Sequence, residues 1–153
     1  MPELSCQTEP IAGLWPELLP LADAHWQEVN PDAGMANIDC ARYQAAEEAG
    51  AFAIMTMRLV KGEESQLVGY ASFWISANPQ QKQTRQATQD ALYLRPDWRR
   101  GRIGRLLLSH AERWLKSNGI TTVYQSVRRA NNFGPLLIAC GYEPIETTYE
   151  KRI

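Results

Sequence analysis

The sequence predicts one mixed α/β (α+β) domain, a mostly antiparallel sheet flanked by helices with one parallel strand pair. Three observations support this fold class. Two helix-like segments precede three strand-like segments, short connections join these strands, and a long amphipathic helix follows the third strand. Short connections favour antiparallel pairing, whereas a strand–helix–strand unit suits a right-handed parallel crossover. Because 153 residues are typical of one domain, we treat 1–153 as a single domain.

The chain is predicted to begin with two helices. Pro16 suits the first turn of a helix over 16–29, where apolar residues recur on one face. A second helix over 39–48 is indicated by Asp39, a good N-cap, and by Gly50 just beyond its end.

Three strands are predicted next, over 51–59, 67–75 and 86–94. The middle segment is apolar on both faces, which is typical of a central strand. A turn over 61–63 joins the first two strands, and a polar loop over 78–85 joins the second to the third.

The second half of the chain predicts two helices and two strands. The clearest helix covers 102–118, because its apolar residues form one continuous stripe. A strand over 120–127 follows, then a short helix that starts at Asn132, and a last strand over 142–151.

Composition excludes several protein classes. The chain is 44% hydrophobic and 22% charged, which is typical of globular proteins and not of disordered ones. No run approaches the roughly 18 apolar residues of a membrane span, and the first residues do not resemble a signal peptide. Cys6, Cys40 and Cys140 are far apart and odd in number, so we expect free thiols and a cytoplasmic location.

Charge is unevenly distributed along the chain. Residues 1–64 carry eleven acidic against three basic residues, whereas residues 65–153 carry thirteen basic against six acidic ones. The first half therefore suits a cationic partner. Five arginines form a dense basic cluster in the second half: Arg95, Arg99, Arg100, Arg102 and Arg105.

This basic cluster lies where the strand over 86–94 ends and the helix over 102–118 begins. The first amides of a helix have no intrahelical partner and attract anions, phosphate groups in particular. Gly101 and Gly104 would let a ligand approach the backbone closely. The segment thus predicts a diphosphate site, with a solvated arginine-rich surface as the alternative. It is neither a Walker A motif nor a dinucleotide fingerprint.

The sequence resembles the GNAT superfamily of N-acetyltransferases over nearly its whole length. The resemblance lies in the element order, in Leu94-Arg95-Pro96, in Arg99 with Gly104 five residues later, and in a late segment from Leu136 to Pro144. Its size and the run over 132–137 also resemble small acetyltransferase-like proteins of phages and prophages. The family implies acetyl-CoA as cofactor, with its pantetheine arm on the third predicted strand and its pyrophosphate on the basic loop. The residues implied to bind it are Leu92, Leu94, Arg99, Arg100, Gly101, Arg102, Gly104, Arg105 and Asn132.

Two positions depart from the family pattern. Arg102 stands where the family loop usually has a glycine, and Leu137 stands where many members have a tyrosine that protonates the leaving thiolate. Tyr124 and Tyr142 are substitutes for that acid, or alternatively core residues. Asp90 matches a position where some members carry a catalytic acidic side chain, and its alternative is a surface carboxylate.

The resemblance places the acceptor beside the first helix. His25 and Trp74 are the candidate substrate-binding residues, with structural roles as their alternatives. Two isolated histidines do not make a metal site, so none is expected.

These observations predict an acetyl-CoA-dependent N-acetyltransferase that acts on a primary amine of a small molecule or peptide, with a cationic acceptor favoured by the acidic first half. The alternatives are an inactive acyl-CoA-binding or interaction module, and a nucleic-acid-binding protein. Nucleic acid and membrane partners are not expected, and a homodimer is an alternative to a monomer because dimers are common in the family.

Overall fold

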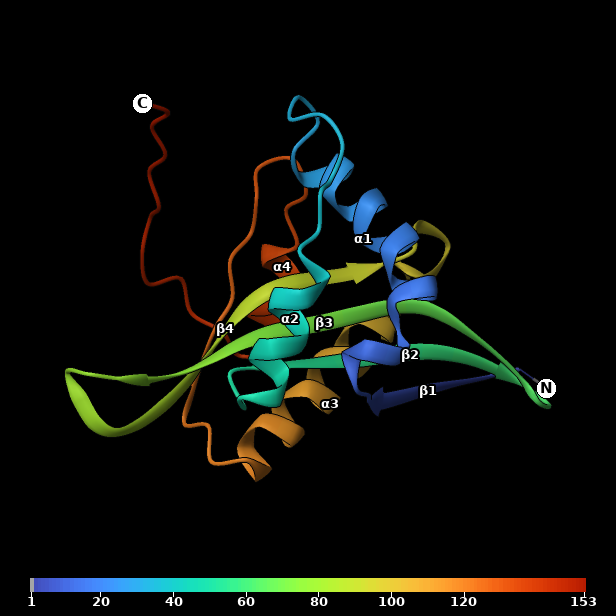
Figure 1. The fold of residues 1–153 in the computed structure, drawn as a ribbon, viewed down its shortest axis with the longest axis horizontal. Coiled ribbons are helices and arrows are strands. Elements are labelled where there is room, and N and C mark those ends of the chain that lie inside the picture. Colours follow the sequence, from blue (N-terminus) through green and yellow to red (C-terminus); the bar gives the residue numbers. More distant parts are fainter. Residues whose placement is uncertain (1) are drawn as a thin grey trace.

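The computed structural model describes residues 2–153 and shows a five-stranded sheet in the order β1-β2-β3-β4-β5 (Figure 1). The strands are β1 (Glu3–Thr8), β2 (Phe52–Lys61), β3 (Glu64–Asn78), β4 (Gln81–Leu94) and β5 (Thr122–Tyr124). Strands β1 to β4 pair antiparallel, whereas β4 and β5 pair parallel. The predicted fold class is therefore confirmed.

Four α-helices cover the two faces of the sheet: α1 (Trp15–Val29), α2 (Cys40–Glu48), α3 (Ile103–Ser117) and α4 (Gly134–Ala139). Two 3-10 turns, η1 (Ile11–Gly13) and η2 (Pro96–Trp98), precede α1 and α3. One core lies under α1 and α2, where Leu18 meets Ile54 and Tyr70. The other lies under α3 and α4, where Leu107 meets Met55 and Phe73. Ile54 and Met55 are neighbours in β2, so this strand is buried on both faces.

The structure corrects four sequence predictions. A strand that was not predicted, β1, precedes the helices and pairs with β2. The segment over 78–85 is no loop, because β3 and β4 continue through it and turn at Pro79 and Gln80. Its polar side chains are mostly exposed, as they can be in a hairpin that extends beyond the core. The fourth predicted strand is limited to β5, three residues long.

The predicted strand over 142–151 is also absent. Residues 143–153 are exposed, carry no strand, and run away from the sheet to the C-terminal end (Figure 1). A strand there would need a neighbouring strand with free backbone groups, and β5 is too short to offer many. The described contacts of this tail include one exposed ion pair, Arg128–Glu150, at 3.9 Å.

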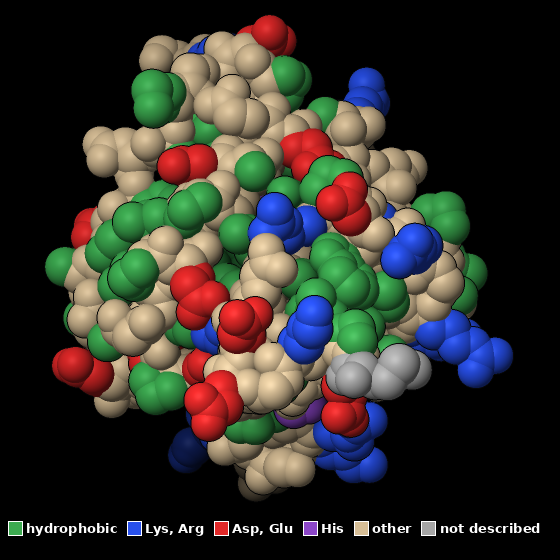
Figure 2. Space-filling view, turned by 90° about the vertical axis from the view of Figure 1, so that its right-hand side faces the viewer, with side chains coloured by type: hydrophobic (Ala, Val, Ile, Leu, Met, Phe, Trp, Pro, Cys, Tyr) green, Lys and Arg blue, Asp and Glu red, His purple; other side chains and the backbone are tan. Residues whose placement is uncertain are grey.

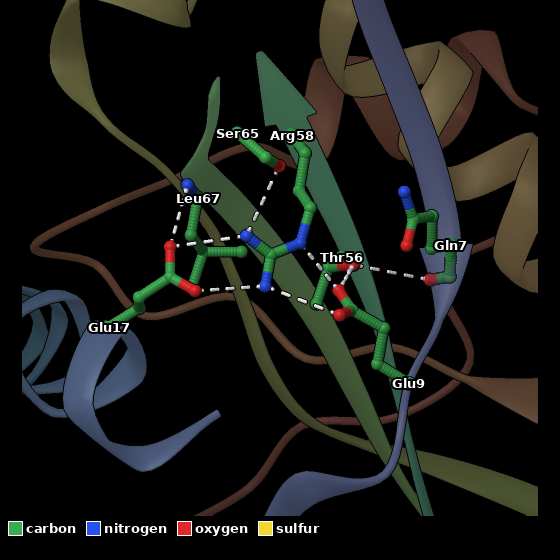
Figure 3. Close-up of polar contacts among 7 residues, drawn as sticks. All are labelled: Gln7, Glu9, Glu17, Thr56, Arg58, Ser65 and Leu67. Atoms are coloured by element: carbon green, nitrogen blue, oxygen red, sulfur yellow. Dashed lines mark hydrogen bonds and ion pairs between the residues drawn. The ribbon is translucent and has the colours of Figure 1, made fainter. Parts of the chain in front are cut away.

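A nearly buried arginine fixes the start of α1 on the sheet (Figure 3). The Arg58 side chain is 9% exposed, and Arg58 lies opposite a bulge of β3. Its Nε donates to Glu9 at 2.8 Å, and its Nη1 and Nη2 donate to Glu17 at 3.1 Å each. Glu17 also accepts from the Leu67 amide at 3.3 Å, and Thr56 donates to Glu9. These contacts join the segment after β1 to α1, β2 and β3, so they set where α1 lies.

Candidate active site

A β-bulge in β4 presents Asp90 to the face of the sheet that α1 and α2 cover. Ser72 of β3 pairs with Ala91, and the next residue, Phe73, pairs with Gln89, so Asp90 is the extra residue. A bulge of this kind reorients one side chain while the rest of the strand keeps its register. Asp90 therefore lies on the same face as Ala91, beside Ser72 and Trp74.

Three donors from different elements hold the Asp90 carboxylate. Ser72 Oγ donates at 3.1 Å, Trp74 Nε1 at 3.0 Å, and Tyr43 Oη from α2 at 3.1 Å to each oxygen. Burial, followed by the charge of Asp90, raises the pKa of Tyr43, which keeps its hydroxyl a donor. Asp90 itself remains exposed and forms no ion pair with a described Lys or Arg. The carboxylate is thus fixed in direction and still open to a ligand.

Strands β4 and β5 separate immediately beside Asp90. Their pairing covers only Gln86 to Thr88 against Thr122 to Tyr124. At the point of separation, the Ser126 amide donates to the side chain of Gln89 at 2.7 Å. The backbone of β4 beyond this point therefore has no strand partner on its β5 side among residues 2–153.

The free edge of β4 includes the backbone groups of Leu92 and Leu94. The Arg95 amide donates to Val68 of β3 at 2.8 Å. Because backbone groups alternate along a strand, those of Leu92 and Leu94 point the other way, toward the gap. The Leu94 carbonyl indeed accepts from Arg99 Nε at 2.7 Å, whereas Leu92 keeps its backbone groups unpaired within the described chain.

The basic loop leads from η2 into the exposed start of α3. Gly101 has a φ of 58°, a conformation that favours glycine, and Arg102 is the N-cap with no side-chain capping bond. Among residues 2–153, nothing accepts from the amides of Gly104 and Arg105. A Cβ on Gly104 would lie 3.1 Å from Leu136 Cδ2, so a larger residue would press against α4. The start of α3 therefore offers free amide donors, and the glycines at 101 and 104 have no side chains that would block a ligand.

The four arginines of this loop and helix start have different surroundings. The Arg99 side chain already has partners within the chain. Its Nη2 donates to Glu28 of α1 at 2.6 Å, and its guanidinium lies 5.2 Å from the Tyr93 ring centre. Arg105 donates to the Ala139 carbonyl at 2.7 Å, at the end of α4. Arg100 lies over Trp98, and Arg102 is exposed; neither forms an ion pair with a described residue.

A groove of about 260 Å³ connects these features. It is lined by Leu92, Tyr93, Leu94, Arg99, Arg100, Gly101, Gly104, Asn131, Phe133 and Leu136. The groove includes the free edge of β4, apolar side chains and the basic start of α3. This combination fits a ligand with an amide-bearing arm and a diphosphate. Asn132 lies beside this groove and accepts from the Gly134 amide at 2.9 Å, at the start of α4.

A larger cleft of about 900 Å³ opens on the other side of Asp90. His25 and Trp74, the two predicted substrate-binding residues, line it together with Asp90. Burial lowers the pKa of His25 below 6.5, with the charges of Glu28 and Asp90 acting in the opposite direction. His25 is therefore mainly neutral at pH 7 and can accept a proton.

Sequence reasoning missed two residues of this cleft. Ser72 could have been found, because alternation along β3 puts it on the same face as Trp74. Tyr43 gave no signal, since only the packing of α2 brings it 5.3 Å from Trp74 by ring centres.

The structure places no tyrosine where the family often has its general acid. Leu137 is 8% exposed and belongs to the core under α3 and α4. Tyr142 is half-buried against the same core, and burial raises its pKa to about 12. Tyr124 lies in β5, the strand that pairs with β4.

On the face shown in Figure 2, basic side chains lie in the centre and on the right, and acidic ones in the centre and on the left, so the two kinds adjoin one another in the centre. Among residues 2–153 no group of His, Cys, Asp and Glu side chains is arranged to hold a metal ion. None of the helices in that range has the length and apolar character needed to cross a membrane.

Solved structures show the same fold in distant acetyltransferases. A ribosomal-protein-alanine N-acetyltransferase from Brucella melitensis biovar Abortus 2308 superposes with a TM-score of 0.74 at 17% identity, over 98% of this chain and 99% of that one. An aminoglycoside acetyltransferase from an uncultured soil metagenomic sample, in complex with sisomicin, has a TM-score of 0.72 at 14% identity, over 98% and 97%. Aminoglycoside N-acetyltransferase AAC(6')-Iy in complex with CoA has a TM-score of 0.73 at 15% identity, over 100% and 96%.

The sequence itself shows the family, independently of the fold. A search of curated protein sequences gave no match. The model of the acetyltransferase (GNAT) family matches residues 15–135, which include Asp90, the basic loop and all of α3. These similarities lend no support to the narrower phage or prophage subgroup. The match covers most of the chain and includes β4, β5 and α3, which form the site. The chain therefore belongs to the GNAT family of N-acetyltransferases.

Proposed function

We propose that this enzyme transfers the acetyl group of acetyl-CoA to a primary amine that binds as an ammonium ion in the cleft at Asp90. The observation that carries the proposal is the position of the Asp90 carboxylate. It faces the 900 Å³ cleft on one side and adjoins the gap between β4 and β5 on the other. An amine held by this carboxylate would lie beside a thioester held in the gap.

The residues along the groove suit acetyl-CoA, which supplies the activated acetyl group when bound. The free backbone groups of Leu92 and the free amide of Leu94 would hold the pantetheine arm, because the Leu94 carbonyl already accepts from Arg99. The amides at Gly104 and Arg105, reached past Gly101, and the side chains of Arg100 and Arg102 would hold the pyrophosphate. Arg99 would act through its contacts to Leu94 and Glu28, which keep the loop in place. Asn132 remains a predicted contact beside the groove.

Different side chains of the cleft bind the amine and accept its proton. Asp90 orients the ammonium, and the proton leaves to the carboxylate directly or through water. Neutral His25, on the same cleft, is a second proton acceptor. Trp74 holds Asp90 and forms part of the wall. Since Leu137 carries no hydroxyl, water is the proposed donor of the proton that the leaving thiolate needs.

The test is steady-state acetyl transfer by Asp90→Asn with a panel of primary amines. Asparagine keeps the size of the side chain and removes its charge, so we expect kcat to fall by about 100-fold or more. The dissociation constant of acetyl-CoA should stay unchanged, because Asp90 does not line the groove. Asp97→Asn, an exposed acid in η2, is the matched control and should keep wild-type activity. Full activity of Asp90→Asn would remove Asp90 from the mechanism.

A second candidate function is an acyl-CoA-binding or interaction module without turnover, and the replacement of the family's tyrosine by Leu137 favours it. Acetyl-CoA binding with no acetylation of any amine in the panel would support it. The cytoplasmic location and the homodimer remain predictions, which cell fractionation and light scattering would test.

A further inference from the structure

The walls of the acceptor cleft are aromatic. On one side of Asp90, four rings form a connected group that we call the Trp74 cluster: Trp15, Tyr43, Phe52 and Trp74. Within it, Tyr43 and Trp74 stack at 5.3 Å with planes 25° apart, and Phe52 meets Trp74 edge-on at 5.1 Å. On the other side, His25 lies 6.4 Å from Tyr70. The carboxylate thus lies between two sets of rings.

Little negative charge is available in the cleft besides Asp90. Two carboxylates, Asp39 and Asp90, and two arginines, Arg42 and Arg128, line the cleft. The Asp39 carboxylate already caps α2 by accepting from the Arg42 amide at 3.0 Å. Asp90 is therefore the one lining carboxylate among residues 2–153 that neither caps a helix nor pairs with a cation.

Four acidic residues of the first half of the chain are engaged outside the cleft. Glu9 and Glu17 bind Arg58, and Glu28 binds Arg99. Glu47 accepts from the Ile11 amide at 3.1 and 3.0 Å. Of the eleven acidic residues in the first half, only Asp39 lines the cleft, so the charge excess of the sequence does not gather at the acceptor site.

One carboxylate between aromatic walls suits one ammonium on an apolar body. A second or third ammonium would find only Asp39 in the lining, which caps α2 and lies beside Arg42, so it would lose its hydration with little compensation. Aromatic faces attract a single cation, and they also stack against a flat apolar group.

Resting on the proposed function, we propose that the acceptor is a primary monoamine on an aromatic body, the arylalkylamine class, and that the Trp74 cluster selects it. The amine would bind Asp90 while its ring packs on Trp74. Multiply charged acceptors such as polyamines and aminoglycosides are then disfavoured, because Arg42 and Arg128 in the lining offset the charges of Asp39 and Asp90.

The experiment compares 2-phenylethylamine, n-butylamine and spermidine as acceptors at saturating acetyl-CoA. We expect kcat/KM to be highest for 2-phenylethylamine, by about tenfold over each of the others. Trp74→Leu keeps an apolar wall without the ring, so it should lower the preference for 2-phenylethylamine over n-butylamine to about twofold, mainly through KM. Tyr149→Leu, in the exposed tail, is the matched control and should keep the wild-type preference.

Binding of the same three amines, followed by tryptophan fluorescence, separates the two proposals. Tighter binding of spermidine than of 2-phenylethylamine would overturn the assigned acceptor class, whether or not turnover occurs. Tight binding of 2-phenylethylamine without acetylation would overturn the proposed function and leave the assigned ligand class standing. A wild-type preference in Trp74→Leu would remove the Trp74 cluster from selection.

Discussion

Arg58 is the residue whose loss should most affect the placement of α1. Arg58→Met keeps the length of the side chain but leaves Glu9 and Glu17 without their partner. Both carboxylates are partly exposed, so we expect a loss of about 2 kcal/mol in the free energy of unfolding. Urea denaturation at pH 7 would measure it. Arg152→Met is the control, because its pair with Glu150 is fully at the surface and should be worth less than about 0.5 kcal/mol.

The same residue predicts how stability depends on pH. The hydrogen bond from Arg58 holds the pKa of Glu17 below its ordinary value of 4.5. A pKa lowered by folding contributes stability that is fully present above the unfolded value and is lost as pH falls through the folded one. The wild type should therefore lose more unfolding free energy between about pH 5 and about pH 3 than Arg58→Met does. Equal losses would mean that Arg58 does not act through Glu17.

At the scale of elements, the start of α3 should decide affinity for the cofactor. Arg102→Glu places a negative charge at an exposed N-cap that makes no side-chain bond. We expect acetyl-CoA to bind about tenfold more weakly, with the melting temperature of the free protein little changed. Isothermal titration would measure the affinity. Arg113→Glu, an exposed change further along the same helix, should leave it intact; an unchanged affinity in Arg102→Glu would refute this location of the site.

Most elements could be predicted from the sequence because they follow from local pattern. The stripe of α3 and the cap at Asp39 are such features, and the structure confirms both. The bulge that turns Asp90 toward the cleft was not predictable, because it appears only in the pairing of β4 with β3. Strand β1 was missed for a related reason: its residues are mostly exposed or half-buried, and only β2 makes them a strand.

At the scale of the whole molecule, acetyl-CoA should stabilise the fold measurably. A ligand at about 100 times its dissociation constant adds about 2.7 kcal/mol, or a few degrees for a domain of this size. A thermal melt with acetyl-CoA should show that shift, whereas ATP, which lacks the pantetheine arm, should give less. Equal shifts would show that the basic loop binds anions without using the edge of β4.

The gap between β4 and β5 also bears on aggregation. An unpaired strand edge is normally a template for another chain. Here the unpaired edge of β4 lies inside the fold, flanked by the groove and by the segment that follows β5, and not at the rim of the sheet. The protein can thus keep this edge of β4 available to a ligand without presenting it at the rim of the sheet.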